Sequence, residues 1–238
     1  MRYRYDFHLH SCLSPCGDND MTPYNLVNMA KVMGLDAIAL TDHNTCLNCP
    51  AAVKAGEEAG ILVLPGMELC VSEEAHIICL FGETEAALEF SRYVEGRLPE
   101  IPNRPEIFGE QRIMDGEDRI TGQYDKLLLT AAAVSVEEVH ALVISYGGIC
   151  YPAHIDRDSY SVLSALGFFS ETWGFPAAEL TRDADERAYR TNYPALAGLS
   201  IVRSSDAHYL EHIGCAGDEM TLKCLKWECI VEALTKKQ

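Results

Sequence analysis

Residues 3–11, YRYDFHLHS, join a short β-forming segment to two histidines. The aromatic and aliphatic side chains of residues 3–9 predict a β-strand, because such residues favour the extended backbone. His8 and His10 stand at the end of this strand, where the chain enters a loop. Neutral imidazole is a ligand for zinc, manganese and iron, so this strand end is a candidate metal site.

The segment that follows predicts a helix and a second strand. Thr22 is a suitable N-cap, Pro23 a suitable first helical residue and Gly34 a suitable stop. Residues 36–40 are strand-like, and they lead directly to His43 in the phrase TDHN. A strand, a helix and a strand in this order predict a βαβ unit with histidines after both strands.

The alternation of strand and helix then continues. A helix is predicted over residues 50–59, and a buried strand over residues 61–64 leads to Glu68. A further strand over residues 75–81 carries His76. Strands that alternate with helices predict parallel pairing, as in α/β proteins.

The regular pattern breaks between residues 97 and 130, where proline, glycine and charged residues are frequent. Residues 111–124 have the pattern of a hairpin that turns at Asp115 and Gly116, so residues 97–130 are interpreted as an insertion. Regular structure is predicted again beyond it. The later elements are a helix that begins at Ser135, a strand over residues 149–153 before His154, a strand over 177–180 with a helix near Arg187, a strand over 199–202, and a C-terminal extension over 211–238 with a strand at 219–224 and a helix at 227–236.

The size and composition of the chain are those of one large globular domain. Its 238 residues are 48% hydrophobic, which suffices for an α/β barrel. The longest apolar runs have the length of strands and are too short to span a bilayer. The start of the chain lacks the apolar segment of a signal peptide, and its ten cysteines then favour reduced thiols in the cytoplasm over disulfides.

The charge balance bears on the expected partner. The formal net charge is −17, from 19 basic and 36 acidic residues. An acidic surface repels the phosphate backbone, so this balance argues against long nucleic acid as a partner. Divalent metals reverse the local potential of a site, so a small phosphorylated substrate is the expected ligand.

The histidines of the chain are concentrated beside predicted strands. Glu68 in PGMEL and Asp206 in SSDAH occupy similar places. Ligands dispersed along a chain at strand ends predict one metal centre at the mouth of a barrel. The histidines in these phrases are His8, His10, His43, His76, His154 and His208.

Together these phrases resemble the PHP (polymerase and histidinol phosphatase) superfamily of metal-dependent phosphoesterases. The resemblance rests on HLH, TDH, GME, AH and SDAH in the family's order, and it extends from about residue 3 to residue 210. It implies a distorted (β/α)7 barrel of the TIM type, formed as a single domain by residues 1–238. The insertion at residues 97–130 is then expected over the barrel mouth or beside it.

The same resemblance implies three divalent metal ions, either zinc, manganese or iron. Asp18 is the least defined ligand, because Asn19 replaces the glycine of the family's D-G-x-x-[ST]-P phrase and Asp20 remains an alternative. By position, the first metal is expected to bind His8, His10, Glu68 and Asp206, the second Glu68, His76 and His154, and the third Asp18, His43 and His208.

Hydrolysis of a small phosphate ester, either a phosphorylated metabolite or a nucleotide, explains the types of residue in this set. A hydroxide activated by the metals is the expected nucleophile, and the positive charge of the metals stabilises the phosphoryl oxygens. The expected catalytic residues are Glu68, His76, Asp206, His208 and Arg157.

Several neighbours of these residues have two possible roles. Arg157 and Arg203 are candidates for phosphate binding, with salt bridges to acidic residues as the alternative. Asp6 and Asp42 are candidates to orient ligand imidazoles, or else to cap loop amides. His140 is interpreted as an ordinary structural histidine, and so is His212.

Other classes of function are also open. The chain could be a non-catalytic or regulatory metal-binding module, or a hydrolase of the amidohydrolase type. Amidohydrolase barrels also begin with HxH, but they usually use a lysine that is not matched here. Cys12, Cys16, Cys46 and Cys49 follow the HLH and TDH phrases, and they could bind an additional ion or cluster or be reduced and semi-buried.

Overall fold

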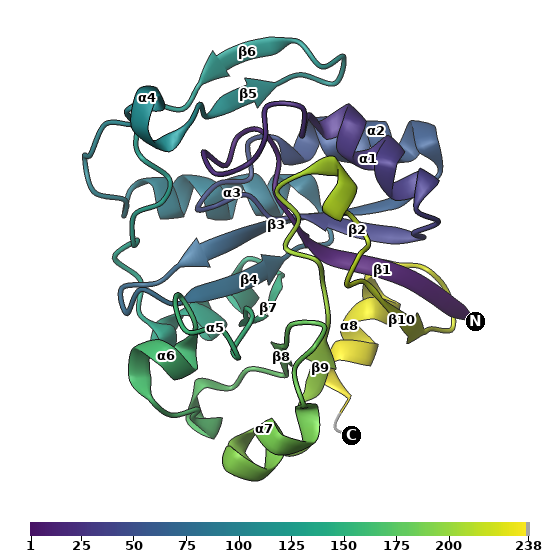
Figure 1. Ribbon diagram of the computed structural model, residues 1–238, viewed down its shortest axis with the longest axis vertical. Helices are drawn as coiled ribbons and strands as arrows, with labels where there is room; N and C mark the ends of the chain where they lie inside the picture. Colours follow the sequence, from purple (N-terminus) through teal and green to yellow (C-terminus); the bar gives the residue numbers. More distant parts are fainter. Residues whose placement is uncertain (237–238) are drawn as a thin grey trace.

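The computed structural model describes residues 1–236, and its centre is a curved six-stranded β-sheet (Figure 1). The strand order is β10–β1–β2–β3–β4–β7. β1, β2 and β3 pair in parallel, so their carboxyl ends meet at one edge. The strands are β1 (Arg2–Leu9), β2 (Ala37–Leu40), β3 (Leu62–Cys70), β4 (His76–Leu80), β7 (Ile149–Pro152) and β10 (Asp218–Thr221).

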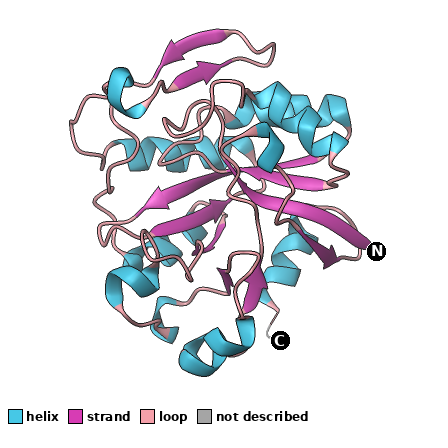
Figure 2. Cartoon of the chain, viewed as in Figure 1, coloured by secondary structure: helices cyan, strands magenta, loops and turns pink. Residues whose placement is uncertain are grey.

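A second, parallel pair of strands, β8 (Ala177–Glu179) and β9 (Ser200–Val202), continues the curve (Figure 2). After β7, the N–H of Ile155 donates to the carbonyl of Glu179 at 2.9 Å. After β9, the carbonyl of Ala207 accepts the N–H of His10 at 3.0 Å. The predicted α/β fold is confirmed and is consistent with a TIM-like barrel, but the count of seven strand–helix units is not confirmed.

Two strand pairings differ from the predicted parallel arrangement. β3 and β4 form an antiparallel hairpin in which Cys70 lies opposite His76, and β4 is also antiparallel to β7. Residues 71–75, which join β3 to β4, are too few for the crossover that a parallel pair requires. The prediction of parallel pairing is therefore wrong at β4.

The first two helices begin and end close to their predicted limits. Thr22 caps α1 (Pro23–Val32), and its side chain accepts the N–H of Asn25. Gly60 ends α2 (Cys49–Ala59) with a φ of 74°, a left-handed conformation that glycine adopts without steric cost. Local sequence signals therefore suffice to define these elements.

Within residues 1–236, three helices lie where the sequence analysis placed no element, and the longest of them spans Thr84–Glu95. α3 (Thr84–Glu95) buries Ala87, Phe90 and Val94 at helical spacing, and this apolar period is the signal that could have predicted it. The remaining helices are α4 (Pro105–Phe108), α5 (Val136–Ser145), α6 (Val162–Leu166), α7 (Glu186–Asn192) and α8 (Trp227–Thr235), with 3-10 turns at Glu171–Trp173, Pro194–Leu196 and Leu210–His212.

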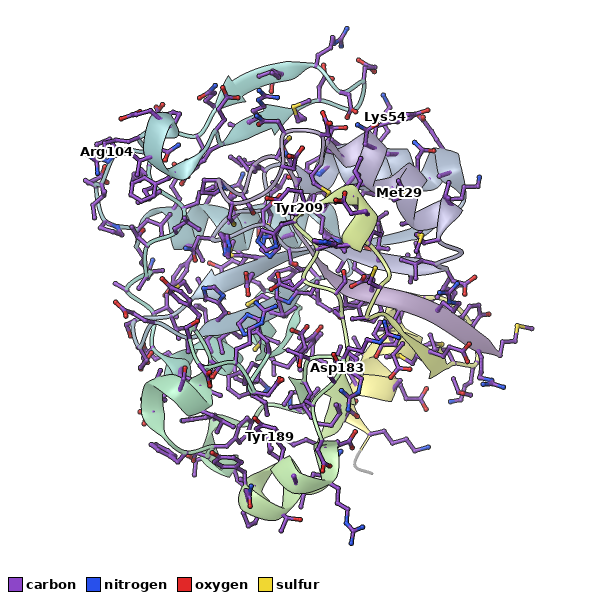
Figure 3. All side chains as sticks on the ribbon, viewed as in Figure 1. Met29, Lys54, Arg104, Asp183, Tyr189 and Tyr209 are labelled. Atoms are coloured by element: carbon purple, nitrogen blue, oxygen red, sulfur yellow. The ribbon has the colours of Figure 1, made fainter. Side chains whose placement is uncertain are left out.

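The predicted hairpin of the insertion is present as β5 (Arg112–Met114) and β6 (Ile120–Gln123). It packs beside α2, because the side-chain amide of Asn48 donates to the carbonyl of Arg112 at 3.1 Å. Lys54 of α2, labelled in Figure 3, forms an ion pair with the turn of the hairpin. The hairpin thus lies next to α2, and it is also joined to the loop after β1, where the N–H of Arg112 donates to the carbonyl of Cys12 at 3.0 Å.

An apolar core lies directly behind the candidate metal site. α8 packs Ile230 and Leu234 into a buried cluster with Tyr5, Phe7 and Tyr151. Tyr5 and Phe7 come from the same strand as His8, so burial of β1 fixes the position of its histidine. Within residues 1–236, no helix combines the length and the apolar character needed to cross a membrane.

Candidate metal centre

Glu68, near the end of β3, lies at the centre of a group of histidines. The residue is only 1% exposed. Its carboxylate oxygens lie within 3.3 Å of five imidazole nitrogens that come from distant parts of the chain. The distances are 3.2 Å to His8 Nε2, 3.3 Å to His10 Nε2, 3.0 Å to His43 Nδ1, 2.8 Å to His76 Nδ1 and 3.1 Å to His154 Nε2.

The ends of the strands explain why these side chains converge. His43 follows β2 and forms an isolated parallel bridge with Glu68 of the neighbouring strand. His154 follows β7 with a φ of 28°, and Asp206 follows β9 with a φ of 51°. Positive φ is uncommon for residues other than glycine, and such strain is concentrated at functional sites. Two of the candidate ligands, His154 and Asp206, therefore have strained backbone conformations.

Asp206 adds a second carboxylate to the group. Its Oδ1 lies 3.1 Å from His10 Nε2 and 3.3 Å from His8 Nε2, yet it is buried and makes no hydrogen bond. Its Oδ2 pairs with Nη1 of Arg157 at 2.6 Å. Buried carboxylate oxygens normally accept hydrogen bonds, so a shared cation is the simplest explanation of the arrangement around Oδ1.

The donor set fits divalent cations. Nε2 of His8 and Nε2 of His10 are 3.2 Å apart, and two neutral imidazoles can share at most one hydrogen between them. Imidazole and carboxylate ligands suit zinc, manganese and iron. Three groups place their ligand atoms within 4.8 Å of one another: His8, His10, Glu68 and Asp206; His43, Glu68 and His76; and His10, His43 and His208.

These groups agree only in part with the ligand sets that the sequence predicted. The first group is identical to the predicted first set, and the second contains Glu68 and His76 with His154 close to the same carboxylate. The third contains His43 and His208 but not Asp18. Oδ1 of Asp18 accepts the N–H of Asp20 at 2.8 Å, and neither of these carboxylates belongs to any of the three groups.

The charges of the group are coupled. Burial disfavours the charged forms of His10 and His43, but Glu68, joined by Asp206 at His10, raises the pKa of each imidazole to about 9. The histidines in turn hold the pKa of Glu68 well below its ordinary value, against the effect of burial. Burial and the neighbouring His10 lower the pKa of His208 to about 3. Cations that bind at neutral pH must therefore displace protons from His10 and His43.

Glu179, at the end of β8, is a functional residue that the sequence analysis missed. It is buried, and its Oε1 lies 3.0 Å from Nδ1 of His8 and accepts the backbone N–H of His154 at 3.1 Å. A carboxylate on Nδ1 fixes the tautomer of His8, so that the lone pair of Nε2 faces the centre. The available signal was a single carboxylate in the apolar segment PAAEL.

Asp42 orients another ligand through a serine. The hydroxyl of Ser14 donates to Oδ1 of Asp42 at 2.7 Å and lies 2.9 Å from Nδ1 of His10. Because its only hydrogen goes to Asp42, this hydroxyl accepts from His10 and holds the hydrogen on Nδ1. Asp42 also accepts the N–H of Ser11 at 2.7 Å, so both of its alternative roles are present.

Asp6 has the backbone-capping role. Its oxygens accept the N–H groups of Ser205 and Gly214, each at 2.9 Å, and so tie β1 to the loop that carries Asp206. Burial raises the pKa of this carboxyl to about 6, although the bonds from Ser205 and Gly214 act in the opposite direction. Asp6 therefore positions the site without touching an imidazole in this structure.

The two candidate arginines differ in placement. Arg157 lies at the pocket with 45% of its side chain exposed, next to Asp206. Arg203 donates to the carbonyls of Thr181 and Arg182 and approaches Glu186 at 3.6 Å. These contacts are structural and support the salt-bridge alternative for Arg203.

The four cysteines near HLH and TDH do not meet. The thiols of Cys46 and Cys49 contact the carbonyl of Gly66 at 3.1 Å and 3.4 Å, inside the core. Cys12 is buried, whereas Cys16 is exposed and lies beside His208. No cysteine of the described chain belongs to a group of potential metal ligands of the kind found around Glu68. The hypothesis of a four-cysteine site is therefore wrong.

Six of the candidate metal ligands line a pocket of about 250 Å³, namely His43, Glu68, His76, His154, Asp206 and His208. Tyr160 stacks on His76 with ring centroids 4.8 Å apart, and Leu128 and Leu129 add apolar surface. A larger cavity of about 460 Å³ lies between β10 and α8, and none of the candidate metal ligands lines it. His140 and His212 lie outside the site, as the sequence indicated.

The chain is similar to several known proteins. The sequence profile of the PHP domain matches residues 6–160. A 5′-3′ exoribonuclease of Haemophilus influenzae is 33% identical over 125 residues, which cover 49% of this chain and 44% of that protein. The chain thus spans less than half the length of this curated relative.

Solved structures show the same fold. A lesion-specific endonuclease from Pyrococcus furiosus has a TM-score of 0.71 at 18% identity, over 99% of this chain and 56% of that one. A protein from Bifidobacterium adolescentis, described as a candidate metal-dependent phosphoesterase, has a TM-score of 0.64 at 20% identity, over 98% and 96% of the two chains.

These relatives overturn one expectation. The net charge argued for a small substrate and against nucleic acid, yet an exoribonuclease and an endonuclease are among the similar proteins. The physical reason is that net charge describes the whole surface, whereas a phosphate group meets only the local potential of the site. The charge of −17 therefore does not exclude nucleic acid.

Proposed function

The chain belongs to the PHP domain family, and from this premise we propose that it is a metal-dependent nuclease that removes nucleotides from the 5′ end of single strands. Family membership confirms the predicted class, a hydrolase of phosphate esters. The choice of nucleic acid and of its 5′ end is supported by the similar exoribonuclease. The predictions of a non-catalytic module and of an amidohydrolase are set aside in this proposal.

The observation that carries the proposal is the convergence of five histidines and Asp206 on Glu68. We propose that the three overlapping groups hold three divalent cations. When bound, such cations lower the pKa of water and polarise a phosphoryl oxygen, which is the chemistry that phosphodiester hydrolysis requires. Glu68 belongs to two of the groups, and its two oxygens suit a bridging role.

The protein's own residues prepare this centre. Glu179 and Ser14 hold hydrogens on the Nδ1 atoms of His8 and His10, so both Nε2 atoms face inward. Arg157 is placed to bind the phosphate, because its half-exposed guanidinium already contacts a site carboxylate at the pocket. An incoming phosphate offers this guanidinium two oxygens, and bidentate contacts of this kind are among the strong hydrogen bonds.

The size of the pocket supports a single-stranded substrate. A volume of about 250 Å³ suits one nucleotide unit rather than a base pair. The Tyr160 ring and the two leucines, Leu128 and Leu129, offer apolar surface to a base, and stacking on aromatic side chains is the usual way to hold an unpaired base. A strand end enters such a pocket without the cost of unpairing a duplex.

The test uses oligonucleotides labelled at the 3′ end. Protein loaded with zinc, manganese or iron is incubated with 5′-phosphorylated single-stranded RNA and DNA, with the matching duplexes, and with a circular single strand. We expect stepwise shortening of the linear single strands and little cleavage of the duplex or circular substrates. Equal cleavage of the circular strand would contradict the end-directed activity, and no cleavage of any substrate with any metal would contradict the nuclease.

Variants connect the activity to the site. His10→Ala and Asp206→Ala each remove a ligand of the first group and should lower the rate at least about a hundredfold. His212→Ala is the matched control, because this exposed histidine lies outside the pocket and should leave the rate unchanged. Undiminished cleavage by both ligand variants would assign the activity to another site or to a contaminant.

A further inference from the structure

Cys16 lies where the predicted third metal position lacks a ligand. Its Sγ is 3.1 Å from Nε2 of His208. His43 and His208 belong with His10 to the third group of potential ligands. Cys16 and these two histidines line the same pocket, and the thiol is reachable from solvent.

Backbone contacts fix this placement. The N–H of Asp18 donates to the carbonyl of His208 at 2.9 Å, and the N–H of Gly17 donates to the carbonyl of Ser14 at 2.8 Å. A Cβ at Gly17 would lie 2.4 Å from the carbonyl oxygen of Ser11, so only glycine allows this tight turn. The turn directs Cys16 to the histidines and leaves the Asp18 side chain on the N–H of Asp20.

We propose that Cys16, and not Asp18, completes the third metal position together with His43 and His208. The inference rests on the metal centre of the proposed function and specifies one of its ligands. On binding, the thiol loses its proton to solvent and the thiolate sulfur takes the place of a carboxylate oxygen. Three protein ligands leave an open coordination position for a phosphate oxygen, as in catalytic zinc sites.

A sulfur ligand changes which metal this position prefers. Thiolate is a soft ligand that favours zinc, whereas carboxylate ligands suit manganese. The other two groups contain only imidazole and carboxylate ligands. The centre is therefore expected to be mixed, with one position selective for zinc and two positions that accept manganese or iron.

The test is spectroscopic and does not depend on catalysis. Metal-free protein is titrated with Co²⁺, because a cobalt–thiolate bond gives a sulfur-to-metal charge-transfer band in the near ultraviolet. We expect this band in the unmodified protein and in Asp18→Asn, and its loss in Cys16→Ser and Cys16→Asp. Cys215→Ser is the matched control, because this second exposed cysteine is not part of the site and should leave the band intact.

Elemental analysis of the same proteins gives an independent readout. Cys16→Ser should contain one zinc equivalent fewer than the unmodified protein, and Cys16→Asp should regain one equivalent when manganese is supplied. Circular dichroism and the denaturation midpoint of each variant establish that it is folded. A charge-transfer band that survives Cys16→Ser would overturn the inference, and so would loss of a metal equivalent in Asp18→Asn but not in Cys16→Ser.

The outcomes separate this inference from the proposed function. If the unmodified protein binds cobalt without a charge-transfer band, the metal centre stands and only the assignment of Cys16 fails. If the protein binds no divalent metal at all, the proposed function fails together with the inference. Both the proposed function and the inference would be supported if cleavage depends on metal and if Cys16→Ser abolishes the charge-transfer band.

Discussion

Replacement of Glu179 tests the arrangement of the site most directly, because this buried carboxylate contacts both the imidazole of His8 and the backbone N–H of His154. In Glu179→Ala, the Nδ1 hydrogen of His8 and the N–H of His154 lose their acceptor while they remain buried. An unsatisfied buried donor costs about 1–3 kcal/mol, so the two together should lower the free energy of unfolding by roughly 2–6 kcal/mol. This is a large part of the roughly 5–15 kcal/mol that stabilises a typical domain.

Glu179→Gln separates charge from hydrogen bonding. The amide oxygen can still accept both donors, because Oε1 alone serves both of them in the unmodified protein, but the bond to His8 is no longer charge-assisted. Charge-assisted bonds contribute about 1 kcal/mol more than neutral ones, so the loss of stability should be small. Metal affinity should still fall by about 10- to 100-fold, because the carboxylate partner no longer orients His8 and increases its basicity.

Two measurements check these values. Urea denaturation of the metal-free protein gives the change in stability, and competition with a chromophoric chelator gives the metal affinity. Glu171→Gln, an exposed carboxylate of the same region, is the control and should change neither quantity. The role assigned to Glu179 would be refuted if Glu179→Ala had the same urea midpoint as the unmodified protein, or if Glu179→Gln had unchanged metal affinity.

Three further perturbations follow from the same structure. Arg157→Ala should lower kcat/KM on single-stranded RNA by about 10- to 100-fold with metal content unchanged, and an equal loss of metal would contradict a role in phosphate binding. Gly66→Ala places a Cβ 2.8 Å from the carbonyl oxygen of Cys79, so it should reduce the free energy of unfolding by about 1–3 kcal/mol, as measured by urea denaturation. The pKa values of His10 and His43 are raised to about 9, so their stabilisation of the metal-free protein is fully present below pH 6.5 and is lost as the pH rises through about 9. Urea midpoints of the metal-free protein should therefore fall between pH 7 and pH 8.5, and a rising midpoint would contradict these protonation states.

Local sequence signals predicted the elements that depend on nearby residues. Thr22 and Pro23 define the start of α1, and Gly60 defines the end of α2, because caps act within a single turn of helix. The same reasoning failed at β4, where the pairing partner decides the strand direction. α3 has apolar residues at helical spacing, a local signal that is sufficient to predict a helix there. The prediction that residues 1–238 form a single domain stays a prediction.

For the site, the sequence by itself determined the chemistry of the ligands. Histidines and carboxylates beside strands, such as His8, Glu68 and Asp206, are sufficient to predict a metal centre, because the ends of parallel strands meet at one edge of a sheet. Ligand type is a property of each residue alone, and strand position follows from local patterns. These parts of the prediction needed no long-range contact.

Only the tertiary structure decided which residues share a position. Glu179 contacts His8 although the two residues are far apart in the chain. Cys16 contacts His208 because a backbone hydrogen bond, from the N–H of Asp18 to the carbonyl of His208, joins a loop near the N-terminus to a loop near the C-terminus. The family's spacing pointed to Asp18, but in the structure the Asp18 carboxylate accepts the N–H of Asp20 and the thiol of Cys16 lies beside His208. Loop conformation depends on contacts with distant segments, so a one-dimensional motif cannot distinguish neighbouring residues within the same loop.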